Sequence, residues 1–290
     1  MRFVLVLVAA RDKITLTDAM LARARALVAG GEPVWLSPGE AAEIPCMAEP
    51  DRADLAAALN HAPVDALCVK ARGRRKAVLI ADMDSTIVTS ETLDEVAGEA
   101  GLKDRIAAIT VRSMAGEVDF ADALRERIAL LKGLDIAALD RTWRHTAFMP
   151  GARELVATMR ANGAVTALVS GGFTFFTARV AAELGFDTHR ANVLLDDGSR
   201  LTGKVAEPVL DRDAKRTALH EIAEQRGVKL AATMAVGDGA NDLAMIADAG
   251  MGIAYHGKPV VTAQARLRVD HADLRALLFA QGYPASVFRA

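Results

Sequence analysis

Three short polar motifs carry the side chains of this 290-residue chain that are best suited to chemistry. Asp82 and Asp84 lie two residues apart, Ser170 precedes two glycines, and Asp238 and Asp242 share a glycine-containing stretch. Carboxylates at alternate positions of an extended chain can face the same side. Glycine lets backbone N–H groups come close to an anion. Together, these residue types suit a reaction on an anionic substrate.

The acidic residues of these motifs imply a bound cation. Clustered carboxylates repel one another and raise one another's pKa unless a cation lies among them. Mg²⁺ commonly combines one or two carboxylates with waters and a substrate phosphate. We therefore expect Mg²⁺ as the cofactor and a phosphate ester as the substrate. Each motif alone also suits an ordinary turn or loop; their order, each after its own strand, favours one shared site.

The elements before the motifs predict an α/β fold with a parallel sheet. Each motif directly follows an apolar run that is too short for a helix and precedes a helical segment. Strands that alternate with helices form a parallel sheet covered on both faces, and ligands bind at the carboxyl ends of its strands. The three runs are residues 77–81, 165–169 and 234–236.

Two insertions interrupt this alternation. Residues 91–149 show amphipathic helical spacing, as in Leu124, Ile128 and Leu131, and predict a helical insertion. Residues 192–195 and 200–205 flank Asp197-Gly198, which is a strong hairpin signal. We expect this hairpin at the edge of the sheet.

The N-terminal part predicts a separate small α+β unit. Its pattern is strand, helix, strand, strand, helix, strand, which is typical of a ferredoxin-like fold. A basic stretch at residues 71–76 follows, and we interpret it as a solvated linker, with anion binding as the alternative. The expected domains are residues 1–74 and 75–290. The six elements are residues 3–8, 16–29, 33–36, 44–47, 51–59 and 66–69.

Composition excludes several classes of function. The 35 Lys and Arg nearly balance the 37 Asp and Glu, so no charge footprint favours nucleic acid or an acidic membrane. The longest apolar run, residues 3–10, is far shorter than the roughly 20 residues of a membrane span. Cys46 and Cys68 lack metal-binding spacing. We expect reduced thiols and a cytoplasmic location.

The motifs resemble the haloacid dehalogenase superfamily of phosphatases and, within it, the phosphoserine phosphatases. The resemblance covers about residue 76 to the C-terminal region. It implies a Rossmann-like sheet of the haloacid dehalogenase type with a helical cap at about residues 91–149. It rests on residues 82–86 with Glu91, residues 120–128 and 169–173, Lys215, and residues 237–242.

The resemblance implies roles for the residues of the core. Asp82 would be the nucleophile that forms an aspartyl-phosphate, and Asp84 the general acid and base. Mg²⁺ would be held by the Asp82 carboxylate, the Asp84 backbone carbonyl and Asp238. Asp242 would support the metal and Lys215. The remaining residues would bind the substrate in the core: Ser170, Gly171, Lys215 and Asn241.

The resemblance also implies the substrate, O-phospho-L-serine, whose hydrolysis is the last step of L-serine biosynthesis. Glu91 would meet its ammonium and Arg127 its carboxylate, while Met114 and Phe120 would close over it. On residue patterns alone, Glu91 also suits a helix cap, and Arg125 and Arg127 suit surface ion pairs. Another small phosphomonoester phosphatase, a phosphotransferase and a non-catalytic amino-acid sensor remain alternatives.

The N-terminal unit is similar in element order to the ACT-type regulatory domains that precede some phosphoserine phosphatases. Members that bind amino acids often have a glycine-containing turn after the first strand. Residues 9–15 contain no glycine. Homodimer formation and stabilisation are therefore expectations of equal standing with serine binding.

Overall fold

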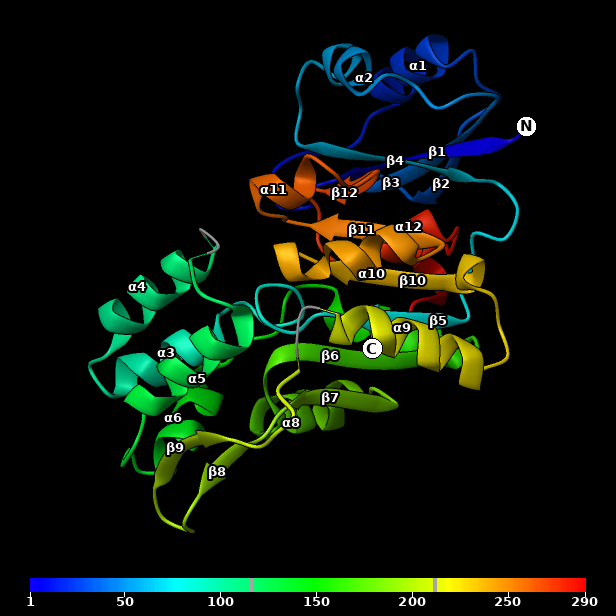
Figure 1. The fold of residues 1–290 in the computed structure, drawn as a ribbon. Helices are drawn as coiled ribbons and strands as arrows, with labels where there is room; N and C mark the ends of the chain where they lie inside the picture. The colour runs from blue at the N-terminus through cyan, green and yellow to red at the C-terminus, as the bar shows by residue number, and fades with distance from the viewer. Residues whose placement is uncertain (115–116, 211–212) are drawn as a thin grey trace.

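The computed structural model describes residues 1–114, 117–210 and 213–290. A six-stranded sheet with helices on both faces forms its centre, and a four-stranded sheet lies beyond one edge (Figure 1). A group of helices stands to one side of the central sheet. This arrangement confirms the predicted fold class.

The central sheet is entirely parallel, with strand order β12-β11-β10-β5-β6-β7. Its strands are β5 (Val78–Ala81), β6 (Val165–Phe173), β7 (Thr188–Asn192), β10 (Thr233–Gly237), β11 (Met251–Tyr255) and β12 (Leu267–Val269). β5 lies between β10 and β6, so the three strands that precede the motifs are neighbours. The motifs therefore meet at one edge of the sheet.

Helices bury both faces of this sheet, which explains why its strands are continuously apolar. On β5, Leu79 contributes to one layer of core, and Val78 and Ile80 contribute to the other. The first layer is completed by α7 (Ala152–Ala161), α8 (Thr174–Leu184) and α12 (Ala276–Ala280). The second is completed by α9 (Ala214–Gln225) and α10 (Leu243–Asp248). The shorter helical pieces are α11 (Pro259–Thr262) and the 3-10 turns Leu230–Ala232, Ala240–Asp242 and Ala285–Val287.

In the described part of the predicted insertion, the cap consists of four helices: α3 (Thr92–Glu99), α4 (Lys103–Met114), α5 (Phe120–Leu130) and α6 (Ala137–His145). α5 begins at Phe120 because Asp119 accepts a hydrogen bond from the N–H of Ala121 at 2.8 Å. None of the described helices combines the length and the hydropathy that a membrane span requires.

The predicted hairpin exists, but its expected position was wrong. Strands β8 (Leu194–Asp196) and β9 (Leu201–Val205) lie against the cap (Figure 1). The N–H of Gly133 donates to the carbonyl of Leu201, and the N–H of Leu201 donates to the carbonyl of Leu134, both at 2.8 Å. The cap thus satisfies backbone groups of the hairpin, which fixes it there instead of at the sheet edge.

The N-terminal unit has the predicted element order and a ferredoxin-like antiparallel sheet, β2-β3-β1-β4. One face of the sheet packs on its own two helices through residues such as Leu5 and Leu7. The elements are β1 (Phe3–Ala9), α1 (Asp18–Leu27), β2 (Val34–Ser37), β3 (Ala41–Cys46), α2 (Arg52–Ala58) and β4 (Val64–Lys70).

The other face of this sheet joins the core of the larger part of the chain. Val6 and Val69 belong to the same buried cluster as Leu277 of α12. Buried Asp65 of β4 accepts hydrogen bonds from the backbone N–H groups of residues 270, 271 and 272, at 2.8, 3.0 and 2.7 Å. The unit is therefore packed into the molecule, and the division at residues 74 and 75 stays a prediction.

The basic stretch is only in part the solvated linker that we expected, because two of its arginines are exposed, whereas Arg74 and Lys76 have partners in the folded chain. Arg74 forms a 2.7 Å ion pair with Glu43, and both side chains are mostly buried. The ammonium of Lys76 donates to the carbonyls of Gly73 and Ala231, at 2.9 and 2.7 Å. Arg74 therefore anchors the stretch to the N-terminal sheet, and Lys76 anchors it to the turn before β10.

Candidate active site

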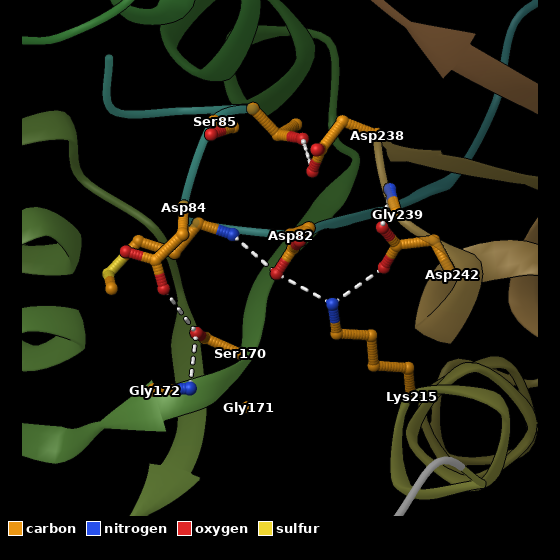
Figure 2. Close-up of polar contacts among 12 residues, drawn as sticks. Asp82, Asp84, Ser85, Ser170, Gly171, Gly172, Lys215, Asp238, Gly239 and Asp242 are labelled. Carbon is orange, nitrogen blue, oxygen red and sulfur yellow. Dashed lines mark hydrogen bonds and ion pairs between the residues drawn. The ribbon is translucent and has the colours of Figure 1, made fainter. Parts of the chain in front are cut away.

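Asp82 and Lys215 form the buried centre of the site (Figure 2). Oδ1 of Asp82 accepts the N–H of Met83 at 2.8 Å and lies 2.6 Å from Nζ of Lys215. The same ammonium lies 2.6 Å from Oδ1 of Asp242. Burial lowers the pKa of Lys215, but Asp242 and Asp82 outweigh it and raise that pKa. Lys215 is therefore a fixed positive charge, although its helical pattern alone suggested a solvated lysine.

The acidic cluster fits a divalent cation. Carboxylate oxygens of Asp82, Asp238 and Asp242 lie within 4.8 Å of one another, and all three residues are buried. Burial, with Asp242 and Asp238, raises the pKa of Asp82 well above its ordinary value, against the opposing effect of Lys215. Lys215 pairs with Asp82 and Asp242, and Lys258 lies 3.2 Å from Asp238, so three clustered carboxylates face two ammonium groups. An all-carboxylate set of oxygen ligands suits a hard ion.

Asp84 turns away from this cluster toward the cap. Oδ1 accepts the N–H of Thr92 at 2.8 Å, and Oδ2 accepts the hydroxyl of Ser170 at 3.3 Å. Burial, with a further contribution from Glu91, raises the pKa of Asp84 to about 6. A carboxyl group with such a pKa can give and take a proton near neutral pH.

The glycine-containing loop of β6 lies directly against Asp84 (Figure 2). The N–H of Gly172 donates to Oγ of Ser170 at 2.8 Å. A Cβ at position 172 would lie 3.0 Å from Oδ2 of Asp84 and 3.1 Å from Oγ of Ser170. A larger residue would therefore have to displace these side chains by a few tenths of an ångström, whereas glycine leaves them in place.

Glu91 is the N-cap residue of α3, yet its side chain does not cap that helix. Asp84 caps the helix instead, because its carboxylate accepts the free backbone N–H of Thr92 in the first turn. Oε1 of Glu91 accepts the hydroxyl of Ser85 at 2.9 Å and lies 3.5 Å from Nζ of Lys258. The helix-cap interpretation of Glu91 is wrong, because another carboxylate fills that role.

Arg125 and Arg127 occupy different environments on α5. Exposed Arg125 forms ion pairs with Asp122 and Glu207, at 2.8 and 2.9 Å. Half-buried Arg127 donates to the carbonyl of Ala123 at 3.3 Å and to the hydroxyl of Thr110 at 3.4 Å, and within the described residues it has no ion pair. The surface-pair interpretation therefore holds for Arg125 and fails for Arg127.

One cavity of about 130 Å³ brings the core and cap residues together. Lys215 and Asp242 do not line it, although Lys215 contacts Asp82, which does. Met114 ends α4, and its side chain lies outside the described residues. Of the predicted residues, the following line the cavity: Asp82, Asp84, Glu91, Phe120, Arg127, Ser170, Gly171, Asp238 and Asn241.

Two residues near the cavity were missed in the sequence. Nζ of Lys258, which follows β11, lies 3.2 Å from Oδ2 of Asp238. Buried Asn192, at the end of β7, contacts the backbone of Gly171. The signal that could have found both is the one that located the motifs: a polar residue at the carboxyl end of a parallel strand.

Comparisons of the sequence give close relatives. A family model described as haloacid dehalogenase-like hydrolase matches residues 79–247. A phosphoserine phosphatase of Polaromonas sp. (strain JS666) is 43% identical over 203 residues, which cover 68% of this chain and 86% of that protein. A phosphoserine phosphatase of Archaeoglobus fulgidus is 41% identical over 212 residues, which cover 73% of this chain and 62% of that protein. The chain thus spans less than two thirds of the archaeal relative.

Solved structures show the same likeness. A phospho-aspartyl intermediate analogue of phosphoserine phosphatase aligns with a TM-score of 0.66 and 38% identity, covering 71% of this chain and 98% of that one. An unliganded probable phosphoserine phosphatase from Vibrio cholerae aligns with a TM-score of 0.81 and 29% identity, covering 99% of this chain and 88% of that one. With this sheet, this acidic cluster and these matches, the chain belongs to the haloacid dehalogenase-like hydrolase family.

Proposed function

We propose that the chain is a phosphatase that hydrolyses O-phospho-L-serine to L-serine and phosphate, the last step of L-serine biosynthesis. One observation carries this proposal: groups for phosphoryl chemistry and groups for amino-acid recognition line the same cavity. Asp82 and Asp84 come from the core, whereas Glu91 and Arg127 come from the cap. The phosphoserine phosphatases among the relatives support the same substrate.

Asp82 is the proposed nucleophile. Within the described residues, its polar contacts with Met83 and Lys215 both end on Oδ1, which leaves Oδ2 to attack phosphorus. The attack forms an aspartyl-phosphate as the bond from phosphorus to the serine oxygen breaks. Water then attacks phosphorus and restores Asp82. Two displacements at phosphorus replace one difficult step.

Asp84 is the proposed general acid and base. In the first displacement it gives a proton to the departing serine oxygen, and in the second it takes one from the attacking water. Its raised pKa, about 6, suits both transfers. The hydrogen bonds from Thr92 and Ser170 hold its carboxyl group at the cavity.

The cation is proposed to be Mg²⁺, held by the Asp82 carboxylate, the Asp84 backbone carbonyl and the Asp238 carboxylate. Both oxygens of Asp242 are already engaged, Oδ1 by Lys215 and Oδ2 by the N–H of Gly239 at 2.9 Å. This supports an indirect role for Asp242. When bound, Mg²⁺ offsets the repulsion between an anionic nucleophile and an anionic phosphate.

The phosphoryl oxygens are proposed to meet Ser170, Gly171, Lys215 and Asn241. Donors and a positive charge at these oxygens act most strongly as charge shifts in the transition state. At the cap, Glu91 would bind the substrate ammonium and Arg127 the carboxylate, with Phe120 and Met114 as the apolar cover. Among the described residues, the guanidinium of Arg127 has no carboxylate partner, which supports its assignment because a planar fork matches a carboxylate.

Replacing Arg127 by alanine is expected to separate substrate recognition from chemistry. Loss of a charge-assisted, two-point contact should raise KM for O-phospho-L-serine by about 10- to 100-fold. KM for p-nitrophenyl phosphate, which has no carboxylate, should change by less than about threefold. Steady-state kinetics on both substrates measures the difference.

The matched control is Arg125→Ala, which removes the same side chain two positions earlier, from exposed ion pairs. It should leave both KM values close to those of the unchanged chain. Equal losses on the two substrates in Arg127→Ala would contradict the carboxylate assignment while leaving the phosphatase assignment intact.

We further propose that the protein acts in the cytoplasm and forms a homodimer through its N-terminal unit. Free, buried Cys46 and Cys68 support a reducing setting. β2 is an edge strand, and its Val34 is exposed, which supports association there. Sedimentation velocity tests the dimer, and a monomer at all concentrations would contradict it.

A further inference from the structure

The backbone segment that carries Ser170 to Gly172 leaves the regular ladder of the sheet. Val169 pairs with Arg190 and Phe173 pairs with Asn192, so three residues of β6 lie opposite one residue of β7. The intervening residues bulge out of the pairing. Their backbone groups therefore need other partners to hold one orientation.

A single peptide unit within the bulge is held at both ends. The carbonyl of Gly171 accepts a hydrogen bond from Nδ2 of Asn192 at 2.9 Å. The N–H of the same peptide, on Gly172, donates to Oγ of Ser170 at 2.8 Å. Because C=O and N–H of a planar trans peptide point in opposite directions, the two bonds fix which of them faces the cavity.

This peptide lies between two glycines, where rotation of the peptide plane meets little steric resistance. A half-turn would direct the carbonyl oxygen toward Ser170 and Asp84 and move the N–H away. A carbonyl dipole in that position repels phosphoryl oxygens, and the half-turn would also remove the N–H that orients Oγ of Ser170. The bond from Asn192 opposes this half-turn, because it would be lost on rotation.

Asn192 also holds a second part of the site. Its Oδ1 accepts the N–H of Leu210 at 2.8 Å, while the side chain is 3% exposed. Leu210 lies shortly before α9, which carries Lys215 near its start. One buried amide thus ties the glycine loop to the segment that leads to the buried lysine. The amide uses its nitrogen as a donor and its oxygen as an acceptor. A carboxylate, which has no donor, cannot replace it.

We propose that Asn192 is a positioning residue that locks the Gly171–Gly172 peptide in the orientation that accepts a phosphoryl group. The inference rests on the proposed function, because it assigns phosphate binding to this loop. Asn192 does not contact the reacting atoms. It acts through the peptide that it holds, and it is expected to matter equally for every phosphomonoester.

The test compares Asn192→Asp with the unchanged chain. The carboxylate keeps the acceptor for Leu210 but faces the Gly171 carbonyl with an oxygen. We expect kcat/KM to fall by roughly 10- to 100-fold, by the same factor for O-phospho-L-serine and p-nitrophenyl phosphate. The inhibition constant of inorganic phosphate should rise by about tenfold or more. This uniform loss differs from the substrate-selective loss expected for Arg127.

The matched control is Asn162→Asp. Asn162 also donates through Nδ2 to a backbone carbonyl, that of Thr158 at 2.8 Å, but it lies after α7, before β6 begins. It should keep phosphate inhibition within about twofold of the unchanged chain. An Asn192→Asp chain that unfolds cooperatively and binds phosphate normally would overturn the inference.

A second variant and a second measurement keep the test decisive if Asn192→Asp does not fold. Asn192→Ser, which is too short to reach both partners, should reproduce the uniform loss. If neither variant folds, hydrogen exchange of the Gly172 amide in the unchanged chain decides: slow exchange supports the locked peptide, and unprotected exchange overturns it. If the unchanged chain is active and the Asn192 variants are equally active, this inference alone is contradicted. If the unchanged chain is inactive on both substrates, the proposed function is contradicted as well.

Discussion

Asp82→Asn is expected to abolish turnover of O-phospho-L-serine, with kcat lowered by on the order of 10⁵-fold, as for the loss of other catalytic nucleophiles. An amide cannot form the phospho-enzyme, although the variant keeps the size of the side chain. The protein should stay folded, because Lys215 retains its 2.6 Å contact with Asp242. Phosphate release and thermal unfolding, measured on the same preparation, check both expectations.

The control for this variant is Asp140→Asn, an equal change on α6 at an exposed side chain that pairs with Arg179. It should retain full activity. Substantial phosphate release by folded Asp82→Asn would mean that water attacks the substrate directly. The phosphatase assignment would then survive, and the covalent step would not.

Lys215→Met is expected to damage both stability and catalysis. The side chain is 4% exposed, and its removal leaves Asp82 and Asp242 buried without their cation. Breaking a buried ion pair from one side destabilises a protein by about 3 to 5 kcal/mol. The variant should also lose on the order of 10³-fold in kcat, because the charge beside the phosphoryl group is gone. Urea unfolding in EDTA and steady-state kinetics measure the two effects.

Lys229→Met provides the comparison, since Lys229 is exposed beyond the end of α9. It should change the free energy of unfolding by less than about 0.5 kcal/mol. If Lys215→Met were equally harmless, the buried triad of Asp82, Lys215 and Asp242 would not hold the site together. Loss of stability with full activity would confine Lys215 to a structural role.

The sequence predicted the architecture well where the signal is local. Short apolar runs followed by polar motifs located β5, β6 and β10, and their shared edge followed from the topology of parallel sheets. The hairpin was predicted from Asp197-Gly198, but its position was not. That position depends on backbone bonds to residues 133–134, which turn chemistry cannot reveal. The partners of Arg74 and Lys76 could not be predicted either, because they are distant in the sequence and become neighbours only in the folded chain.

The site shows the same limit at the level of single side chains. Arg125 and Arg127 lie two positions apart on one helix, so they point roughly 200° apart. Periodicity predicts that separation but not which arginine faces the cavity, and the family resemblance supplied the choice of Arg127. The burial of Lys215 was also not predictable from the helical pattern, because a lysine on an amphipathic helix is usually solvated. Asn192 had a signal at its strand end, but its two backbone partners become neighbours only in the folded chain.

The most direct test of the proposed function is phosphate release from O-phospho-L-serine by the unchanged chain, with Mg²⁺ and after its removal with EDTA. We expect release that requires Mg²⁺, returns when Mg²⁺ is added back, and exceeds release from p-nitrophenyl phosphate at equal concentration. Release from p-nitrophenyl phosphate alone would contradict the substrate while keeping the phosphatase core. No release from either compound with Mg²⁺ present would contradict the proposal that this cavity performs phosphoryl chemistry.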